Sequence, residues 1–175
     1  PFEIKKPTVL LLSGGADSSL MLERSQTGFD IDFAFFFNYG QPHYKEVEYA
    51  RVNCRRFGVR LCEFSTMDLK GTGENNVYPN RNSILVMSAA MRGAKRVLLG
   101  CNANDADDYE DCRPSYWSLF SKLYPEVKVE LPFIMRQKSD IMDEVRRLGI
   151  GHWSCYHGYS EPCGECASCK RLAGL

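Results

Sequence analysis

The sequence predicts an α/β fold in which a parallel sheet is flanked by helices. Short apolar runs alternate along the chain with amphipathic stretches whose apolar residues recur at helical spacing. The first apolar run also stops at a glycine turn, which opens a helix-like segment. Such alternation is typical of parallel strands joined by helices. With 175 residues, of which 44% are hydrophobic, the chain has the size of one domain with a core of its own.

The first half of the chain contains three expected strands and two expected helices. Residues 8–12 form the first strand, and residues 18–25 form the helix that follows the glycine turn. Residues 31–37 have the continuous apolar character of a buried strand. The pattern then predicts a helix over 44–57 and a strand over 59–64, which completes a second strand–helix–strand unit.

The second half continues the alternation less regularly. Residues 82–93 have helical composition and end at a glycine, and residues 96–99 follow as a short buried strand. The last expected helix covers 138–148 and ends at Gly149. Residues 70–80 are rich in Gly and Asn and are expected to form a loop.

The glycine turn after the first strand is a candidate phosphate site. In a parallel sheet this turn lies at the carboxyl ends of the strands, where ligands bind. Glycines allow a ligand to approach the backbone closely, and the following helix N-terminus offers unpaired N–H groups. Asp17 can hold a magnesium ion that bridges phosphate oxygens. The simpler alternative, a turn with an N-cap Ser or Asp, stays open. The candidate contacts are Leu12, Ser13, Gly14, Gly15, Asp17, Ser18 and Ser19.

The C-terminal cysteines have the spacing of a metal site. The pattern C-x₇-C-x₂-C-x₂-C places three thiols on a tight turn and a fourth one short loop away. Four thiolates complete a closed tetrahedral zinc shell, which is typical of a structural site. An iron–sulfur cluster is compatible with the same spacing, and His152 or His157 could replace one thiolate. The expected ligands are Cys155, Cys163, Cys166 and Cys169.

The other four cysteines carry weaker signals. Cys54, Cys62 and Cys101 fall in or beside apolar elements and are expected to be buried as small hydrophobic residues. Cys112 lies in a loop expected near the ligand crevice, where we favour a positioning role over that of a nucleophile.

Charge and hydropathy restrict the class of partner. Lys plus Arg and Asp plus Glu both number 22, so strong electrostatic capture of nucleic acid is not expected. A small-molecule substrate is more compatible with this balance. No apolar stretch approaches the ~20 residues that span a bilayer, and no signal-peptide pattern opens the chain. We therefore expect a cytoplasmic protein without membrane partners, in a reducing compartment that favours metal-bound thiols over disulfides.

At Ser13–Ser18 the chain resembles the pyrophosphatase-loop family of ATP-using enzymes, whose motif S-G-G-x-D-S it matches in full. The resemblance implies a Rossmann-like fold of the adenine-nucleotide α-hydrolase type. It also implies that AMP is transferred to a carboxylate or carbonyl oxygen before a nitrogen or sulfur nucleophile attacks. Residues 1–150 would form this ATP-binding domain, and residues 151–175 a zinc-binding segment packed on it.

Further motifs resemble the QueC family of 7-cyano-7-deazaguanine (preQ0) synthases over nearly the whole chain. The segment Asn38–His43 with Glu46 is similar to its Y-G-Q-x-H region, and residues 79–82 are similar to its P-G-R-N. Residues 100–113 align without a gap and include Tyr109-Glu-Asp-Cys-Arg113, which is similar to the family's Y-P-D-C-R. Lys138 with Ile141, and the Trp153-Ser-Cys-Tyr and Pro162-Cys-Gly motifs of the tail, complete the resemblance.

This resemblance implies an ATP-dependent C–N ligase that converts 7-carboxy-7-deazaguanine and ammonia to the nitrile through an amide. It implies ATP, magnesium and zinc as cofactors and small molecules as substrates, and since family members are dimeric it leaves a homodimer open. Asp17, Arg81 and Lys138 would be catalytic. For Arg81 a surface charge, and for His43 a helix start, remain alternatives. The implied substrate contacts are Tyr39, Gln41, His43, Asn82, Asp105, Tyr109, Asp111 and Arg113.

The chain also departs from the family pattern. It is shorter than usual, and the segment between Asp68 and Pro79 is abbreviated. Asn80 and Asp108 stand where glycine is usual. Two other functions stay open: another adenylating amidase or tRNA thiolase with the same loop, and a catalytically silent zinc-stabilised module that only binds nucleotide or deazaguanine.

Overall fold

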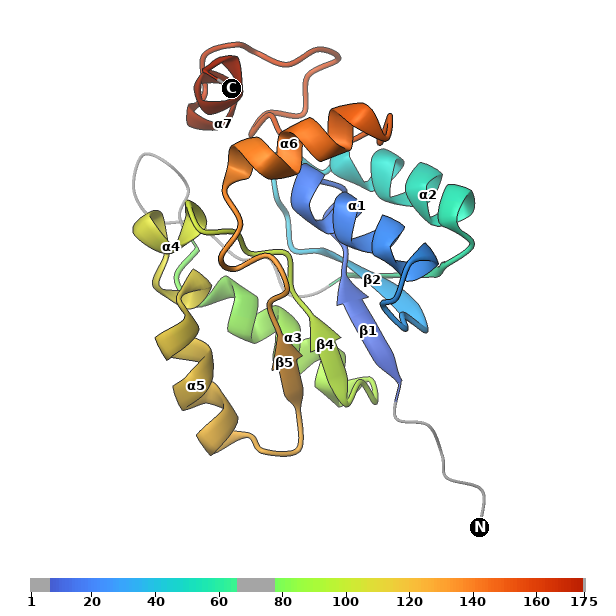
Figure 1. The fold of residues 1–175 in the computed structure, drawn as a ribbon, viewed down its shortest axis with the longest axis vertical. Helices are drawn as coiled ribbons and strands as arrows, with labels where there is room; N and C mark the ends of the chain where they lie inside the picture. Colours follow the sequence, from blue (N-terminus) through green and yellow to red (C-terminus); the bar gives the residue numbers. More distant parts are fainter. Residues whose placement is uncertain (1–6, 66–77, 175) are drawn as a thin grey trace.

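The computed structural model describes residues 7–65 and 78–174, which form an α/β domain around a five-stranded sheet. The strand order is β3-β2-β1-β4-β5, and each neighbouring pair is parallel. This confirms the predicted parallel sheet flanked by helices (Figure 1). The strands are β1 (Thr8–Leu11), β2 (Phe33–Asn38), β3 (Arg60–Ser65), β4 (Arg96–Leu98) and β5 (Lys128–Glu130).

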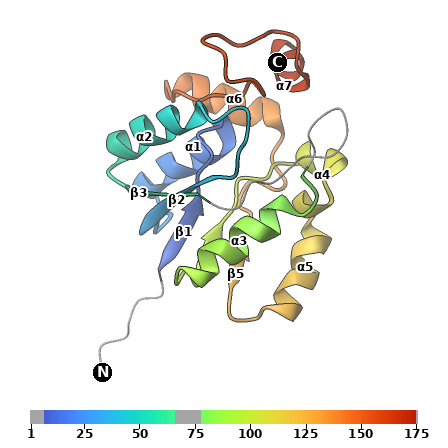
Figure 2. The ribbon, with the colours of Figure 1, turned by 180° about the vertical axis from the view of Figure 1, so that it is seen from behind.

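Helices cover both faces of the sheet, as Figures 1 and 2 show from opposite sides. One face carries α1 (Ala16–Glu23), α2 (Glu46–Phe57) and α6 (Lys138–Arg147), and the other carries α3 (Arg81–Met91) and α5 (Pro114–Leu123). The shorter elements are η1 (Arg24–Gln26), α4 (Asp105–Asp108), η2 (Glu110–Cys112) and α7 (Ala167–Ala173). No helix in the described ranges is long and apolar enough to cross a membrane.

The period-two alternation of the strands divides the core into two layers. Leu10 and Leu12 pack with α1, α2 and α6, whereas Val9 and Leu11 pack with α3 and α5. All four side chains are at most 6% exposed, so β1 is buried on both faces. This explains its continuous apolar sequence, which is typical of a central parallel strand.

The eight elements expected from the sequence are all present, with boundaries within about two residues of those predicted. Helix α5, strand β5 and helix α7 were not predicted. Strand β5 has three residues, which is too short for a periodic signal, and α7 lies inside the cysteine pattern. Residues 70–77 of the expected loop lie outside the described residues.

Candidate active site and metal centre

A cavity of about 720 Å³ opens at the carboxyl ends of the parallel strands. Strand β1 pairs with β2 on one side and with β4 on the other, so the chain order reverses beside it. Ligands of open α/β sheets bind at such a point, because the two loops diverge there and leave a crevice. The ends of β1, β2 and β4 contribute Leu12, Phe37 and Leu99 to the cavity wall.

The glycine turn between β1 and α1 forms one end of this cavity. Gly14 has φ +91°, and a Cβ at this position would lie 2.1 Å from the Glu46 backbone oxygen. The turn is held internally by Ser13, whose Oγ accepts a hydrogen bond from the Gly15 N–H at 3.1 Å and lies 3.0 Å from Ser18 Oγ. Only glycine therefore allows this turn to pack against the start of α2, which places the N-terminus of α1 at the cavity.

Most of the expected phosphate contacts do line the cavity, but two do not. Leu12, Ser13, Gly15, Asp17 and Ser18 belong to its wall, whereas Gly14 faces α2. Ser19 is fully buried, and its N–H donates to the Gly15 oxygen at 3.0 Å. Helical geometry directs position 19 away from the cavity wall, and a phosphate contact of Ser19 stays a prediction.

Asp17 and Lys138, 121 residues apart in the sequence, form an ion pair at the cavity wall. The second Asp17 oxygen accepts a hydrogen bond from Asn102 Nδ2 at 3.0 Å. The Lys138 N–H donates to Asn104 Oδ1 at 2.9 Å, which fixes the first residue of α6. A magnesium ion bound to Asp17 would compete with the Lys138 ammonium, and a single carboxylate plus phosphate oxygens is a usual magnesium ligand set.

Asp105 also belongs to the cavity wall and is linked to this pair through Asn102. Its Oδ2 accepts hydrogen bonds from the Asn102 side chain at 2.7 Å and the Asn102 N–H at 3.2 Å. Burial, together with the negative charge of Asp17, raises the pKa of Asp105 to about 6. The carboxylate can therefore exchange a proton near neutral pH, which is a property of general acids and bases.

The cavity wall also contains a polar cluster in which Tyr39 and Glu46 are buried and His43 and Arg81 are half-buried. Arg81 donates a hydrogen bond to the Tyr39 hydroxyl at 3.1 Å, and His43 Nε2 lies 3.7 Å from Glu46 Oε1. Burial lowers the pKa of His43 to about 4 and raises the pKa of Glu46 to about 8. Near neutral pH this contact therefore joins two uncharged groups, and Arg81 supplies the fixed charge.

Two expected substrate contacts form hydrogen bonds with loop backbone atoms and do not line the cavity. Gln41 accepts a hydrogen bond from the Tyr39 N–H at 2.8 Å and donates to the Phe37 oxygen at 3.1 Å. Arg113 donates from Nε to the Ala106 oxygen at 2.9 Å and is exposed. Neither belongs to the cavity wall, so each shapes a loop that carries other wall residues.

The remaining expected substrate contacts, Asn82, Tyr109 and Asp111, lie in the cavity wall. Asp111 Oδ2 accepts a hydrogen bond from the Asn82 N–H at 3.0 Å and so satisfies the first turn of α3. Asn80 is the N-cap residue of α3, but its side chain makes no capping hydrogen bond. Asn80 has φ +56°, a left-handed conformation that Asn tolerates at a position where the family pattern has glycine.

The four expected cysteine ligands form a candidate metal centre. The Sγ atoms of Cys155, Cys163, Cys166 and Cys169 all lie within 4.8 Å of one another. Four sulfurs at ~2.3 Å from one tetrahedral ion stand about 3.8 Å apart, whereas the thiolates of an iron–sulfur cube sit on separate irons. The spacing thus fits a single ion. Within the described chain, His152 and His157 are not part of any such group.

Backbone N–H groups surround these sulfurs. Cys155 Sγ accepts from the N–H groups of His157 and Cys163, both at 3.4 Å. Cys163 Sγ accepts from the N–H groups of Glu165 at 3.4 Å and Cys166 at 3.3 Å. Such donors stabilise negatively charged sulfur, so the loop is arranged for thiolates.

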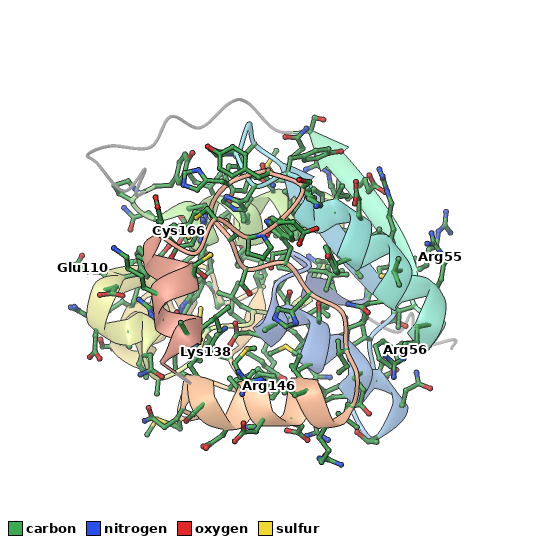
Figure 3. The ribbon with its side chains drawn as sticks, turned by 90° about the horizontal axis from the view of Figure 1, so that it is seen from above. Arg55, Arg56, Glu110, Lys138, Arg146 and Cys166 are labelled. Carbon is green, nitrogen blue, oxygen red and sulfur yellow. The ribbon has the colours of Figure 1, made fainter. Side chains whose placement is uncertain are left out.

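The segment that carries the metal centre crosses the carboxyl edge of the sheet, as Figure 3 shows from above. At its start, the Trp153 N–H donates to the Gly14 oxygen at 3.0 Å, which joins it to the glycine turn. At its end, α7 contributes Lys170 and Arg171 to the cavity wall. Sequence analysis assigned no role to Glu46, Asn102 or Arg171, although Glu46 and Asn102 occur in the motifs it used.

These features define a parallel α/β fold with a cavity at the carboxyl ends of its strands and a candidate four-cysteine metal centre beside that cavity. The chain resembles the U34-tRNA thiolase NcsA from Methanococcus maripaludis, with TM-score 0.63, 18% identity, and coverage of 97% of this chain and 64% of that one. It also resembles an NMN synthetase from Francisella tularensis, with TM-score 0.55, 17% identity, and coverage of 83% and 62%. At these identities the likeness concerns the fold.

The sequence comparisons define the family. The family model described as "Queuosine biosynthesis protein QueC" matches residues 7–78 and 67–175, and the chain belongs to this family. A 7-cyano-7-deazaguanine synthase of Caldicellulosiruptor bescii is 32% identical over 195 residues, covering 92% of this chain and 88% of the relative. The synthase of Psychromonas ingrahamii is 29% identical over 200 residues, covering 95% and 90%.

The comparisons also bear on the chain's length. The alignment with a synthase of Prochlorococcus marinus spans 209 residues, more than the 175 of this chain, so the relative carries inserted residues. The two segments that match the family model overlap at residues 67–78. This is the part of the chain in which the sequence pattern is abbreviated.

Proposed function

We propose that this protein converts 7-carboxy-7-deazaguanine and ammonia to 7-cyano-7-deazaguanine in an ATP-dependent reaction. The observation that carries the proposal is the Asp17–Lys138 pair beside the S-G-G-x-D-S turn, at the end of a cavity in a chain of this family. Relatives that cover most of the chain are named 7-cyano-7-deazaguanine synthases. The reaction class is that of a C–N ligase.

The first activation makes the carboxylate reactive. A substrate carboxylate oxygen attacks the α-phosphorus of ATP, and pyrophosphate leaves as the acyl adenylate forms. The turn Ser13–Ser18 and the N-terminus of α1 hold the departing pyrophosphate, and Lys138 stabilises the developing charge. Ammonia then attacks the acyl carbon, AMP leaves, and the product is the amide.

The second activation removes the amide oxygen. The amide oxygen attacks the α-phosphorus of a second ATP and pyrophosphate leaves again. Loss of AMP and of the two amide protons then produces the nitrile. Asp105 is placed to accept a proton in these steps, since its pKa of about 6 leaves it mainly ionised at neutral pH. Arg81, half-buried in the cavity wall, supplies a fixed positive charge.

The proposal also assigns the cofactors and the surroundings. Asp17 would bind the magnesium ion that accompanies ATP. Zinc would occupy the four-cysteine centre, where a closed shell fixes the chain but leaves no open position for chemistry. The division into an ATP-binding domain of residues 1–150 and a zinc segment of residues 151–175 belongs to the same proposal, as do a cytoplasmic location and a homodimer.

The cavity also contains the groups proposed to recognise the deazaguanine ring. Tyr39, His43, Asn82, Tyr109 and Asp111 lie in its wall and offer ring faces, hydrogen-bond donors and acceptors. Gln41 and Arg113 act on the substrate only through the loops they hold.

The test is a mass-spectrometric assay of the purified protein with 7-carboxy-7-deazaguanine, ammonium, magnesium and ATP. The expected products are the nitrile, AMP and pyrophosphate, with the amide as a transient intermediate. Release of pyrophosphate excludes the silent binding module, and use of ammonium distinguishes the ligase from a thiolase. A folded, metal-loaded protein that forms neither amide nor nitrile would contradict the proposal.

A further inference from the structure

The described cavity wall contains four basic side chains, those of Arg81, Lys138, Lys170 and Arg171. Two of them are engaged in the cavity, since Lys138 pairs with Asp17 and Arg81 donates to the Tyr39 hydroxyl. The proposed reaction must hold a triphosphate and a carboxylate together in this space. Even with the magnesium ion proposed at Asp17, such an accumulation of negative charge favours further positive side chains in the cavity wall.

Arg171 reaches the cavity wall from the C-terminal segment. It lies on α7, whose first turn is fixed by the metal-centre cysteines: the Cys166 sulfur accepts a hydrogen bond from the Cys169 N–H at 3.4 Å. Arg171 follows Cys169 by two residues, so the cysteine group positions the helical turn that carries its side chain. Figure 3 labels Cys166, at the start of α7, and Lys138, at the start of α6, and both residues belong to the cavity wall.

The partner of Arg171 can be exchanged. Arg171 Nη2 lies 2.8 Å from Asp108 Oδ2, and these side chains are 36% and 49% exposed. Arg171 Nη1 lies 4.0 Å from Asp105 Oδ1, which is 25% exposed. Exposed ion pairs contribute little to stability, because water screens them. A carboxylate or phosphate inside the cavity can therefore compete with Asp108 for the guanidinium.

We propose that Arg171 is an anion-binding residue of the cavity, which exchanges Asp108 for the carboxylate or phosphate oxygens of a bound substrate. This inference rests on the proposed function for the identity of the anion. Asp108, on the short helix α4, is then the resting partner of Arg171 in the empty site. The segment of residues 151–174, which carries the candidate metal centre, thus supplies a substrate contact in addition to its structural role. The planar guanidinium suits both anions, because it can donate two parallel hydrogen bonds to either.

If the Arg171–Asp108 ion pair only holds α7 against α4, the two substitutions should affect substrate binding in a different pattern. If the ion pair only fastens α7, removal of either partner breaks the same contact and has the same effect on substrate binding. If Arg171 binds substrate, loss of Arg171 weakens binding, whereas loss of Asp108 frees the guanidinium and leaves binding unchanged or tighter. The sign of the Asp108 effect therefore separates the two roles.

The experiment is isothermal titration of the full, metal-loaded chain with two probes, 7-carboxy-7-deazaguanine and α,β-methylene-ATP. Arg171→Ala, Arg171→Lys and Asp108→Ala are compared with Arg146→Ala, which removes an exposed ion pair with Asp143 (3.3 Å) outside the cavity. Metal content and thermal midpoint are measured for each variant. All four variants are expected to keep their metal, because none removes a cysteine.

Arg171→Ala is expected to weaken at least one probe about tenfold or more, since a charge-assisted hydrogen bond is lost. Arg171→Lys should lose less, and Asp108→Ala and Arg146→Ala should lose nothing. Weaker binding of the deazaguanine identifies a carboxylate as the anion, and weaker binding of the ATP analogue identifies phosphate. The inference is overturned if Arg171→Ala binds both probes normally, or if Asp108→Ala weakens binding as much.

The two proposals fail separately in this design. A wild-type chain that binds the ATP analogue but not 7-carboxy-7-deazaguanine contradicts the proposed substrate, while the nucleotide titrations still decide the role of Arg171. A chain that binds neither probe contradicts both proposals.

Discussion

Two regions of this molecule build the same cavity by different physical means. The sheet and its helices are held by two apolar layers, and β1 contributes Leu10, which is fully buried. The segment from residue 151 to 174 buries only Trp153 and Cys155 among its described residues. Burial of apolar surface stabilises the first region, whereas the second depends on four cysteines and a few polar contacts. A change in the first region can therefore disrupt chemistry while metal binding is kept, whereas a change at the cysteines is expected to affect both.

The largest effect expected is on turnover, from a change in the sheet region that leaves the fold intact. Asp17→Asn removes the charge that pairs with Lys138 and the proposed magnesium ligand. We expect product formation to fall at least about a hundredfold, because a charge positioned for the transition state is lost. The thermal midpoint and metal content should remain near those of the wild type. Asp143→Asn, which changes a 75% exposed acid on α6, is the matched control.

Turnover of Asp17→Asn tests the proposed role of the ion pair only if the variant still folds. Asp17→Asn with wild-type turnover would remove the proposed role of the ion pair. An unfolded Asp17→Asn protein would show instead that the pair is needed to fix α6 beside α1.

The complementary change breaks the second region. Cys166→Ser removes one ligand of the candidate metal centre and the side chain that caps α7. We expect metal affinity to fall at least about a hundredfold and the thermal midpoint to decrease, since metal binding contributes to folding. Turnover should fall through the displaced Arg171. Metal analysis with calorimetry measures both effects, and Cys62→Ser, a half-buried thiol on β3, is the control.

A stable, fully active Cys166→Ser protein would show that the metal centre does not support the fold. A protein that loses its metal but keeps wild-type affinity for both titration probes would show that the segment does not shape the cavity.

The two regions also differ in what the sequence could predict. The S-G-G-x-D-S turn was placed correctly, because a buried strand followed by glycines has few conformations. Its exception is Ser19, whose direction depends on the exact start of α1, and helix starts are the least certain part of such a prediction. The cysteine group was also found, since metal ligation imposes its own spacing.

Long-range pairing was not predictable from the same patterns. Nothing in the local sequence indicates that Lys138 reaches Asp17, or that the Asp111 side chain rather than an asparagine side chain caps α3. Arg171 was missed for the same reason, because its partner Asp108 lies 63 residues earlier in the chain. Such contacts follow from the packing of complete elements, which a single sequence does not display. The family resemblance supplied part of this information for Lys138 and Arg81.

An intermediate effect is expected from pH. Burial and the charge of Asp17 raise the pKa of Asp105 to about 6, and Lys138, Arg171 and Tyr156 also face this carboxylate. If ionised Asp105 accepts a proton, kcat/KM should fall as the pH decreases below about 6. The contribution of Asp105 to the free energy of unfolding should instead increase as the pH decreases. A carboxyl pKa raised by folding means that the folded state binds more protons, so Asp105 contributes more stability as the pH falls.

The pH profile of Asp105→Asn is the direct check on this assignment. Its activity should be lower and should no longer decrease below pH 6, while the profile of the wild type does. His43 cannot cause the decrease in activity below pH 6, because its pKa is lowered to about 4. If the activity of Asp105→Asn still decreases below pH 6 as in the wild type, another group is responsible for the titration.

The smallest effect is expected from the two thiols in the cavity wall. Cys101 and Cys112 are buried there, at 3% and 6% exposure, and a hydrogen bond between them together with burial raises the pKa of Cys101. A thiol kept protonated is a poor nucleophile, and attack by ammonia on an adenylate needs none. Cys101→Ala should therefore change turnover by less than about twofold and lower stability by about 1 kcal/mol, as a small core truncation does. Steady-state kinetics and a denaturant titration measure the two effects. A loss of turnover comparable to that of Asp17→Asn, in a folded protein, would instead favour a sulfur-transfer reaction at this cavity, in which these thiols would take part.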